Sequence, residues 1–333
     1  MAATAPLFGP ELSVSFETQA LPESLPEHEL FRFRFGKDLD DDGADNTFRL
    51  HIEPVGYVAR DEIWHTSGPV AIGQSNGFTY AECEQHLAAH IQMDPNSTGD
   101  FRDLTADAYT RLLSVVQQRG YPNLVRTWNF FPQINQGSGD DERYKLFTAG
   151  RARAFEKNGY AAPMLPAGTA IGTDPDTPFT ISAIATRENC KTVENPRQTS
   201  AYNYPRNFGP KSPSFSRAVT VASRGGHKIL ISGTASIVGH ESRHDENPER
   251  QILESLQNVE NLIQHAKAVT QSGANGNPII DCYMRVYVRR KEQVIEIKRA
   301  LGKKLTVDQH IMFLRGDICR RELLVEIEAA CKI

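Results

Sequence analysis

The pattern of apolar and polar positions predicts strands that alternate with amphipathic helices along most of the chain. In the first half, the strand pattern occurs at residues 69–73, 124–131 and 179–186, and helical spacing at residues 103–119 and 142–157. In the second half, strands are predicted at residues 218–223, 228–239, 280–288 and 323–329, and helices at residues 248–266 and 293–301. Residues 29–35 and 48–52 alternate charged with aromatic or apolar residues and are interpreted as two paired strands.

The two halves share one order of elements: strand, long helix, strand, short helix, strand. We interpret this order as a structural duplication, since the correspondence is in pattern more than in identity. Strands separated by amphipathic helices indicate an α+β fold, with mixed sheets and helices packed on one face. Residues 187–214 are rich in Asn, Pro, Ser and Gly and are interpreted as the boundary segment between two domains. The predicted domains are residues 1–195, with an N-terminal extension, and residues 196–333.

Composition and charge exclude several classes of protein. Hydrophobic residues at 39% and charged residues at 23% are typical of a globular chain, and no apolar run is long enough to cross a bilayer. The net charge of −4 offers no basic footprint for nucleic acid. The N-terminal residues do not have the pattern of a secretory signal. Five scattered cysteines without C-x-x-C spacing predict reduced thiols and a cytoplasmic protein.

Residues His240–His244 match the zinc-binding pattern H-E-x-x-H but are not interpreted as a metal site. The zinc mechanism requires both histidines on one face of a helix, one turn apart. Here a predicted strand precedes the motif, and a helix start follows it, with Asn247 as N-cap and Pro248 at the first helical position. The motif therefore falls in a connection too short for a helix, and we expect no metal there.

A second motif, Asp38, Asp40, Asp42 and Gly43, imitates the beginning of an EF-hand calcium loop. At its twelfth position stands Arg49, where calcium needs a bidentate Glu, and the flanking segments are predicted strands instead of helices. We interpret these residues as the acidic tip of a hairpin.

Arginines in apolar surroundings are the main candidates for ligand binding. Arg151 shares a helix face with aromatic residues, and Arg285 lies with two tyrosines on one face of a strand. A buried guanidinium must be paired or must wait for an anion. Further candidates come from the boundary segment, namely Tyr202, Tyr204, Arg206 and Arg217. The set suits a small dianionic ligand, because guanidinium binds carboxylates through two hydrogen bonds. The alternative for each, a surface arginine whose stem covers apolar neighbours, stays open.

Two segments near the ends of predicted strands carry the remaining candidates. The turn Ser232–Ala235, which contains Gly233, is the most informative stretch of its strand. In the C-terminal strand, Glu326 alternates with Val325 and Ile327, and periodicity alone leaves it facing solvent. By pattern, Cys319 is a small core or surface thiol.

These segments resemble a known family. Residues 323–329, LLVEIEA, are similar to the final strand of the Rid (YjgF) superfamily. Residues 199–218, 229–242 and 313–329 together resemble the chorismatases, enzymes that cleave chorismate and are built on a Rid-like fold. In the first half, residues 126–135 and 142–155 resemble the same family. The resemblance covers most of the chain from about Gly56 onward and implies two Rid-like α/β domains in one chain.

The resemblance also implies an activity. Chorismatases release pyruvate without a metal or an organic cofactor, and they begin by protonating the enolpyruvyl methylene. Glu326 corresponds to the acid, which an apolar pocket would have to hold neutral at working pH. Arg151, Arg206, Arg217, Arg285 and Tyr202 become candidates for holding the two carboxylates of chorismate, a purpose that their side chains suit.

The family divides by product, and two positions in this chain resemble the branch that forms 3-hydroxybenzoate. That branch carries Gly in the S-G-T-A-S turn and Cys seven residues before the acid, here Gly233 and Cys319. We therefore expect a carbon–oxygen lyase that gives 3-hydroxybenzoate, with 4-hydroxybenzoate as a further product in some members. The alternatives are the hydrolytic branch, which forms a dihydroxycyclohexadiene carboxylate, and a Rid-type enamine or imine deaminase or ligand-binding protein. Both a monomer and a trimer are compatible with the sequence.

Overall fold

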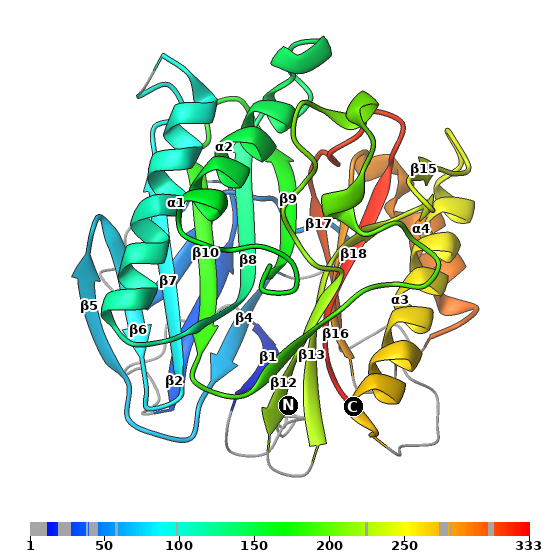
Figure 1. Ribbon diagram of the computed structural model, residues 1–333. Helices are drawn as coiled ribbons and strands as arrows, with labels where there is room; N and C mark the ends of the chain where they lie inside the picture. Colours follow the sequence, from blue (N-terminus) through cyan, green and yellow to red (C-terminus); the bar gives the residue numbers. More distant parts are fainter. Residues whose placement is uncertain are drawn as a thin grey trace.

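The computed structural model describes residues 12–18, 28–37, 39, 46–56, 59–97, 99–223, 226–272, 279, 282–305 and 310–333. Two six-stranded sheets form its main body, each with two helices on its outer face, and a four-stranded N-terminal sheet packs behind them (Figure 1). A two-stranded hairpin, β14 (Ile237–Val238) and β15 (Glu241–Ser242), lies beside the second sheet.

The first six-stranded sheet has the order β5-β6-β7-β10-β8-β9. Its strands are β5 (Ala71–Ser75), β6 (Phe78–Glu82), β7 (His86–Met93), β8 (Asn123–Pro132), β9 (Ala167–Thr173) and β10 (Phe179–Thr186). β8 and β9 run parallel, and the other neighbours are antiparallel. The predicted strands at residues 69–73, 124–131 and 179–186 are present, whereas β6, β7 and β9 were not predicted.

The second sheet repeats this arrangement, with the order β11-β12-β13-β18-β16-β17. Its strands are β11 (Cys190–Val193), β12 (Ala218–Ser223), β13 (Gly226–Ala235), β16 (Cys282–Val288), β17 (Ile311–Arg315) and β18 (Val325–Lys332). Both sheets place their strands in the sequence first, second, third, sixth, fourth, fifth, and both end in a parallel pair. The predicted duplication is confirmed by this shared topology.

Each sheet carries a long helix after its third strand and a shorter one after its fourth. The helices are α1 (Phe101–Gln118) and α2 (Arg143–Lys157) on the first sheet, and α3 (Pro248–Thr270) and α4 (Val294–Gly302) on the second. α3 begins as predicted, because the side chain of Asn247 accepts a hydrogen bond from the backbone of Arg250 and Pro248 occupies the first turn. The α+β class, with helices on one face of mixed sheets, is confirmed. None of the described helices is long and apolar enough to cross a membrane.

The N-terminal sheet has the order β1-β4-β2-β3, formed by β1 (Ser13–Thr18), β4 (Arg60–His65), β2 (Glu29–Phe35) and β3 (Thr47–Leu50). β2 and β3 pair in parallel, so the predicted hairpin between residues 35 and 48 is wrong: an adjacent parallel pair requires a crossover. Most of the acidic stretch that resembles a calcium loop, including Asp38, Asp40, Asp42 and Gly43, lies outside the described residues.

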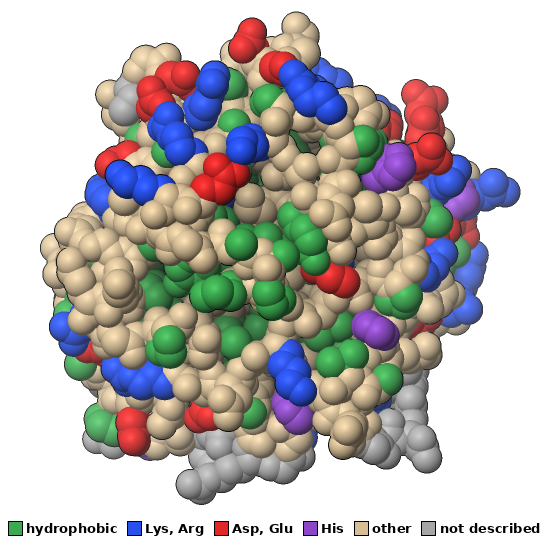
Figure 2. Space-filling model, viewed as in Figure 1, with side chains coloured by type: hydrophobic (Ala, Val, Ile, Leu, Met, Phe, Trp, Pro, Cys, Tyr) green, Lys and Arg blue, Asp and Glu red, His purple; other side chains and the backbone are tan. Residues whose placement is uncertain are grey.

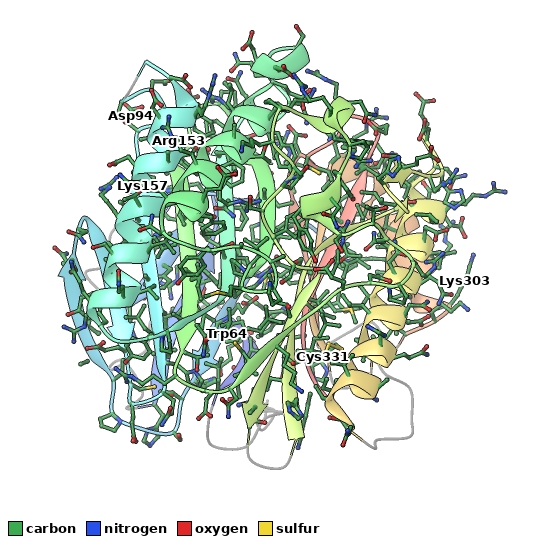
Figure 3. The ribbon with its side chains drawn as sticks, in the orientation of Figure 1. Trp64, Asp94, Arg153, Lys157, Lys303 and Cys331 are labelled. Atoms are coloured by element: carbon green, nitrogen blue, oxygen red, sulfur yellow. A yellow bond between two sulfur atoms is a disulfide. The ribbon has the colours of Figure 1, made fainter. Side chains whose placement is uncertain are left out.

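The inner faces of all three sheets share one hydrophobic core. Trp64 of β4 and Trp128 of β8 meet edge to face, with ring centroids 5.9 Å apart, and Leu230 and Tyr287 come from the second sheet. Figure 3 shows Trp64 inside the molecule, below the centre of the view. Two further cores lie under the helices, one beneath α1 and α2 and one beneath α3 and α4. The central strands of the two six-stranded sheets are therefore buried on both faces, and polar groups on their inner faces must find partners there.

The chain passes from the first sheet to the second between Thr186 and Cys190. The predicted division after residue 195 would separate β11 from its antiparallel partner β12. We propose residues 187–189 as the division between the two units.

Two of the five cysteines form a disulfide, which corrects the prediction of reduced thiols. Cys282 of β16 and Cys331 of β18 are direct cross-strand partners, with Cα atoms 4.2 Å apart. They are 49 residues apart in the sequence, so nothing in their spacing revealed the pair. Cys83, Cys190 and Cys319 are free.

Alkylation of the unfolded chain tests this pairing. Without reductant, an alkylating reagent should modify three cysteines, and after reduction it should modify five. Reduction should also lower the free energy of unfolding by about 2–4 kcal/mol, because it releases a long closed loop in the unfolded chain. Mass spectrometry and denaturant titration are the measurements. Five modified cysteines without reductant would contradict the pairing.

Candidate active site

A cavity of about 250 Å³ lies where the two halves meet, close to the lower end of the size range of small-ligand pockets. The first half contributes Tyr144 and Lys145 of α2, and the second half contributes the C-terminal strand and the connection that precedes β12. Aromatic side chains of that connection, among them Tyr204, Phe208 and Phe215, form much of the wall. Figure 2 shows one face of the molecule, where Lys and Arg side chains lie among Asp and Glu side chains over the upper part.

Glu326 lies in this cavity and is 5% exposed. It does not face solvent, as periodicity alone suggested, because the first half covers the inner face of β18. Val325 and Ile327 point the other way, into the core under α3 and α4. The alternation correctly predicts which residues share a face of the strand, but both faces are buried.

The pKa of Glu326 is raised to about 8, chiefly by burial and also by the nearby carboxylate of Glu328. Arg126 and Arg217 act in the opposite direction, since a positive charge favours the ionised form. Burial prevails, so the cavity holds a carboxylic acid that keeps its proton at neutral pH.

Gly233 lies directly against this carboxyl group. A Cβ atom at this position would stand 2.0 Å from Oε1 of Glu326, a distance that no side chain can occupy. The pairing register of β13 with β18 shifts between Ile231 and Thr234, and this irregularity brings the backbone of Gly233 to the acid. The backbone N–H of Gly233 donates to Oγ1 of Thr169 in β9, at 3.0 Å. Glycine is therefore the residue that lets Glu326 adopt this position.

Cys319, in the turn between β17 and β18, also lines the cavity. The pKa of its thiol is raised to about 12, chiefly by burial and also by Glu326, which is itself ionised at such high pH. The sulfur is therefore a protonated, weak hydrogen-bond donor and not a thiolate nucleophile. Burial likewise raises the pKa of the Tyr144 phenol well above its usual value, so that hydroxyl stays neutral.

Behind Glu326, the carboxylate of Glu328 is held by four hydrogen-bond donors and one ion pair, from three strands. They are Nη2 of Arg126 (2.6 Å), Nε1 of Trp128 (3.0 Å), Oγ1 of Thr169 (2.5 Å), Nη1 of Arg285 (2.9 Å) and the hydroxyl of Tyr287 (3.1 Å). Two of these partners are guanidinium groups, so the carboxylate of Glu328 is paired with two cations. A fixed negative charge thus stands two residues along the strand from the neutral acid.

Of the predicted arginines, only Arg217 lines the cavity. Its Nη2 donates to the carbonyl of Thr199 and to the hydroxyl of Tyr204, at 2.8 and 2.7 Å. Its Nε has no hydrogen-bond partner among the described residues. A buried cation with donor capacity to spare is suited to an anionic ligand.

Arg285, by contrast, is a structural residue. It is 2% exposed, donates to Glu62 of β4 at 2.5 and 2.6 Å, and stacks over Phe33 of β2. The N-terminal sheet therefore supplies the anion for which this arginine was expected to wait, and Arg285 does not line the cavity.

The remaining predicted binding residues lie outside the cavity wall. Arg206 is exposed and forms a two-point ion pair with Asp140 at 2.6 and 2.9 Å. Tyr202 packs against the core beneath α1 and α2. Arg151 is buried, with its guanidinium 4.8 Å from the ring centre of Phe147 and 5.9 Å from that of Phe215. Since Phe215 is a wall residue, Arg151 supports the wall from behind.

Several wall residues were missed from the sequence. Arg320 donates to the carbonyl of His240 at 2.9 Å and lies 4.2 Å from the ring centre of Phe208. Arg321 and Lys145 add positive charge at the same cavity. The adjacency of Arg320 and Arg321 to Cys319 was the available signal, but a pair of arginines in a turn is also typical of a solvated surface.

The H-E-x-x-H segment lies in the β14–β15 hairpin, as its position between strand and helix predicted. Gly239 and His244 have positive φ angles of 61° and 63°, which interrupt any helix. Nε2 of His244 lies 3.2 Å from a carboxylate oxygen of Glu254, and His240 packs against Phe208. No cluster of three potential metal ligands occurs among the described residues.

Comparisons with known proteins agree on one family. A family model described as chorismatase FkbO/Hyg5-like, N-terminal, matches residues 62–185. A 3-hydroxybenzoate synthase of Streptomyces hygroscopicus is 33% identical over 274 residues, which are 80% of each chain. A chorismatase of the same organism is 32% identical over 290 residues, 86% of this chain and 83% of its own. A chorismatase crystal structure is 29% identical, covers 97% of this chain and 98% of its own, and superposes with a TM-score of 0.87.

The raised pKa of Glu326 predicts a characteristic stability profile. In the unfolded chain this carboxyl ionises near its ordinary value of 4.5, whereas in the folded protein it keeps its proton up to about pH 8. The folded state binds the proton more tightly, so stability is lost as the pH rises from about 4.5 to about 8. Glu326→Gln removes this loss. The melting temperature of this variant should therefore exceed that of the parental protein by an amount that grows as the pH rises across that interval.

Thermal unfolding of both proteins from pH 4 to 9 measures the effect. Glu296→Gln, an exposed substitution on α4, is the matched control and should show no such trend. A constant difference between Glu326→Gln and the parent at every pH would show that Glu326 is ionised in the folded protein.

Proposed function

This chain belongs to the chorismatase family, and we propose that it converts chorismate to 3-hydroxybenzoate and pyruvate with Glu326 as the general acid. The family membership rests on relatives that are 32–33% identical over at least 80% of both chains. The observation that carries the mechanism is the neutral carboxyl of Glu326 in a cavity between the two halves. No cofactor enters the proposal.

The first step is proton transfer to carbon. The carboxyl of Glu326 gives its proton to the methylene of the enolpyruvyl ether, a C–H bond forms, and positive charge develops at the ether carbon. The carboxylate that remains faces this charge and stabilises it in a site that excludes most water. Because protonation of carbon is slow, the acid must be fully protonated at working pH, which the pKa of about 8 provides.

Arg217 is the proposed anchor for a substrate carboxylate. Among the arginines predicted to bind the substrate, it is the one that lines the cavity, and its charge lowers the pKa of Glu326. Arg320, Arg321 and Lys145 surround the same space and would hold the second carboxylate. Two fixed carboxylates orient the ether against the acid, which is the main contribution that binding can make to the rate.

Gly233 and Cys319 are proposed to set the product. Chorismate contains the same atoms as 3-hydroxybenzoate and pyruvate together, so this route consumes no water, whereas the hydrolytic branch adds one. Gly233 allows Glu326 to lie close to the floor of the cavity, and Ala235, Ile237 and Phe215 give it apolar walls. Such walls favour the route in which no water attacks the ring.

The site draws its residues from both halves of one chain, since Tyr144 of the first half and Glu326 of the second line the same cavity. We therefore propose that a single chain holds a complete site, so that a trimer is not required for activity. The cytoplasmic location stays a prediction.

Product analysis tests the reaction. Incubation of chelator-treated protein with chorismate, followed by chromatography and mass analysis, should give equal amounts of pyruvate and 3-hydroxybenzoate. Glu326→Gln should lower kcat by at least about 100-fold, because general acid catalysis contributes about that much or more.

The other outcomes are equally informative. Pyruvate with a dihydroxycyclohexadiene carboxylate would move the protein to the hydrolytic branch and remove the role given to Gly233 and Cys319. Chorismate that decays only at its background rate would favour a Rid-type deaminase or a binding protein.

Two arginine variants test the binding assignment. Arg217→Lys, which keeps the charge but loses the two-point geometry, should raise KM for chorismate about 10- to 100-fold, the value of one or two charge-assisted hydrogen bonds. Arg206→Ala should leave kcat/KM within about twofold, because exposed ion pairs contribute little. Steady-state kinetics under one set of conditions gives both values. The reverse ranking would return Arg206 to the site and remove Arg217.

A further inference from the structure

We propose that Glu328 and Thr169, neither of which lines the cavity, are positioning residues that keep the proton on Glu326. The proposal rests on the proposed function, in which Glu326 is the acid. It concerns two buried side chains that take no direct part in the transfer of the proton to the substrate.

Thr169 connects the two carboxyl groups. Its hydroxyl donates to Oε2 of Glu328 at 2.5 Å and accepts the N–H of Gly233 at 3.0 Å, and Nη2 of Arg126 donates to it at 2.7 Å. Gly233 is the residue against which the carboxyl of Glu326 lies. One hydroxyl of the first half therefore fixes both the negative charge behind the acid and the backbone beside it.

The group that accepts the N–H of Gly233 affects the pKa of Glu326. A carboxylate that accepts a backbone N–H is stabilised in its ionised form and gives up its proton at lower pH. In this structure the N–H is donated to Thr169 instead, so it does not stabilise ionised Glu326. If the hydroxyl is removed, this donor loses its acceptor, and the carboxyl group that lies against Gly233 is available to replace it.

Glu328 acts through its charge. It lies two residues from Glu326 on the same face of β18, about 7 Å along the strand, and both side chains are buried, which weakens solvent screening. Glu142, Lys145, Arg320, Arg321 and Glu322 line the same cavity as Glu326. The groups whose charges shift its pKa are Glu328 of β18, Arg126 of β8 and Arg217 before β12, and the titratable side chains of Tyr144 of α2 and Cys319 after β17 interact with it. Both cations favour loss of the proton, and Glu328 is the carboxylate that opposes them.

Two substitutions test the proposal through the pH dependence of kcat/KM. Activity falls on the basic side when the acid loses its proton. In Thr169→Val and in Glu328→Gln, this basic limb should move to lower pH by about one unit, the size expected when one hydrogen bond or one nearby charge changes. For Thr169→Val, kcat at pH 8 should fall about fivefold while KM stays within about twofold. Thr169→Ser keeps the hydroxyl and should restore the parental profile.

Thr127→Val is the matched control. Thr127 is also a buried threonine, one position from Arg126 and Trp128 on β8, but its hydroxyl has no hydrogen-bond partner among the described residues. Its removal should leave the basic limb in place. If Glu328→Gln fails to fold because Arg126 and Arg285 lose their anion, Thr169→Val decides alone.

A basic limb that stays at its parental position in Thr169→Val would overturn the proposal, including the case in which activity falls equally at every pH. Failure of the proposed function is a separate result, because it shows as an absence of pyruvate from the parental protein. In that case, ¹³C NMR titration of the Glu326 carboxyl, assigned with Glu326→Gln, still measures the shift. The same variants then confirm or exclude the positioning role.

Discussion

The burial of two carboxyl groups side by side on one strand is the constraint on which the rest of the structure depends. Glu326 and Glu328 share the inner face of β18, and both are at most 5% exposed. Two adjacent buried charges would be costly, so the protein treats them differently. The carboxylate of Glu328 receives four hydrogen bonds and an ion pair with Arg285, whereas Glu326 stays protonated in a cavity with few partners. The difference between the two environments creates the acid.

This arrangement explains why the chain is duplicated and why it carries a third sheet. The donors to Glu328 come from β8 and β9 of the first half and from β16 of the second. Arg285 is in turn neutralised by Glu62 of the N-terminal sheet. Each sheet thus contributes to the balance of charge behind the cavity. A six-stranded unit alone would expose this face of β18 to water, and the acid would ionise at its ordinary pKa.

The wall of the cavity likewise combines apolar side chains with a buried positive charge. Apolar groups from the connection before β12 exclude water, and Arg217 supplies the buried positive charge for an anion. Arg151, which the helix pattern singled out, supports the aromatic wall through Phe215 instead of reaching the cavity. A family relation to chorismatases gives this geometry its chemical meaning, since a dicarboxylate with an acid-sensitive ether needs a neutral acid and fixed cations.

The sequence by itself determined the elements that local physics controls and the residues that a family resemblance identifies. Periodicity placed α1, α2, α3 and β10 to within a few residues, and the motifs around Gly233, Cys319 and Glu326 led to the cavity. Only the tertiary structure decided what lies opposite each polar side chain. Arg217 directly precedes β12 and Arg285 lies within β16, and both are buried, yet one faces a cavity and the other faces Glu62, 223 residues away in the sequence. The same reason hid the pairing of Cys282 with Cys331 and the burial of Glu326. Alternation reports which residues share a face of a strand, and only the packing of the sheets decides what covers that face.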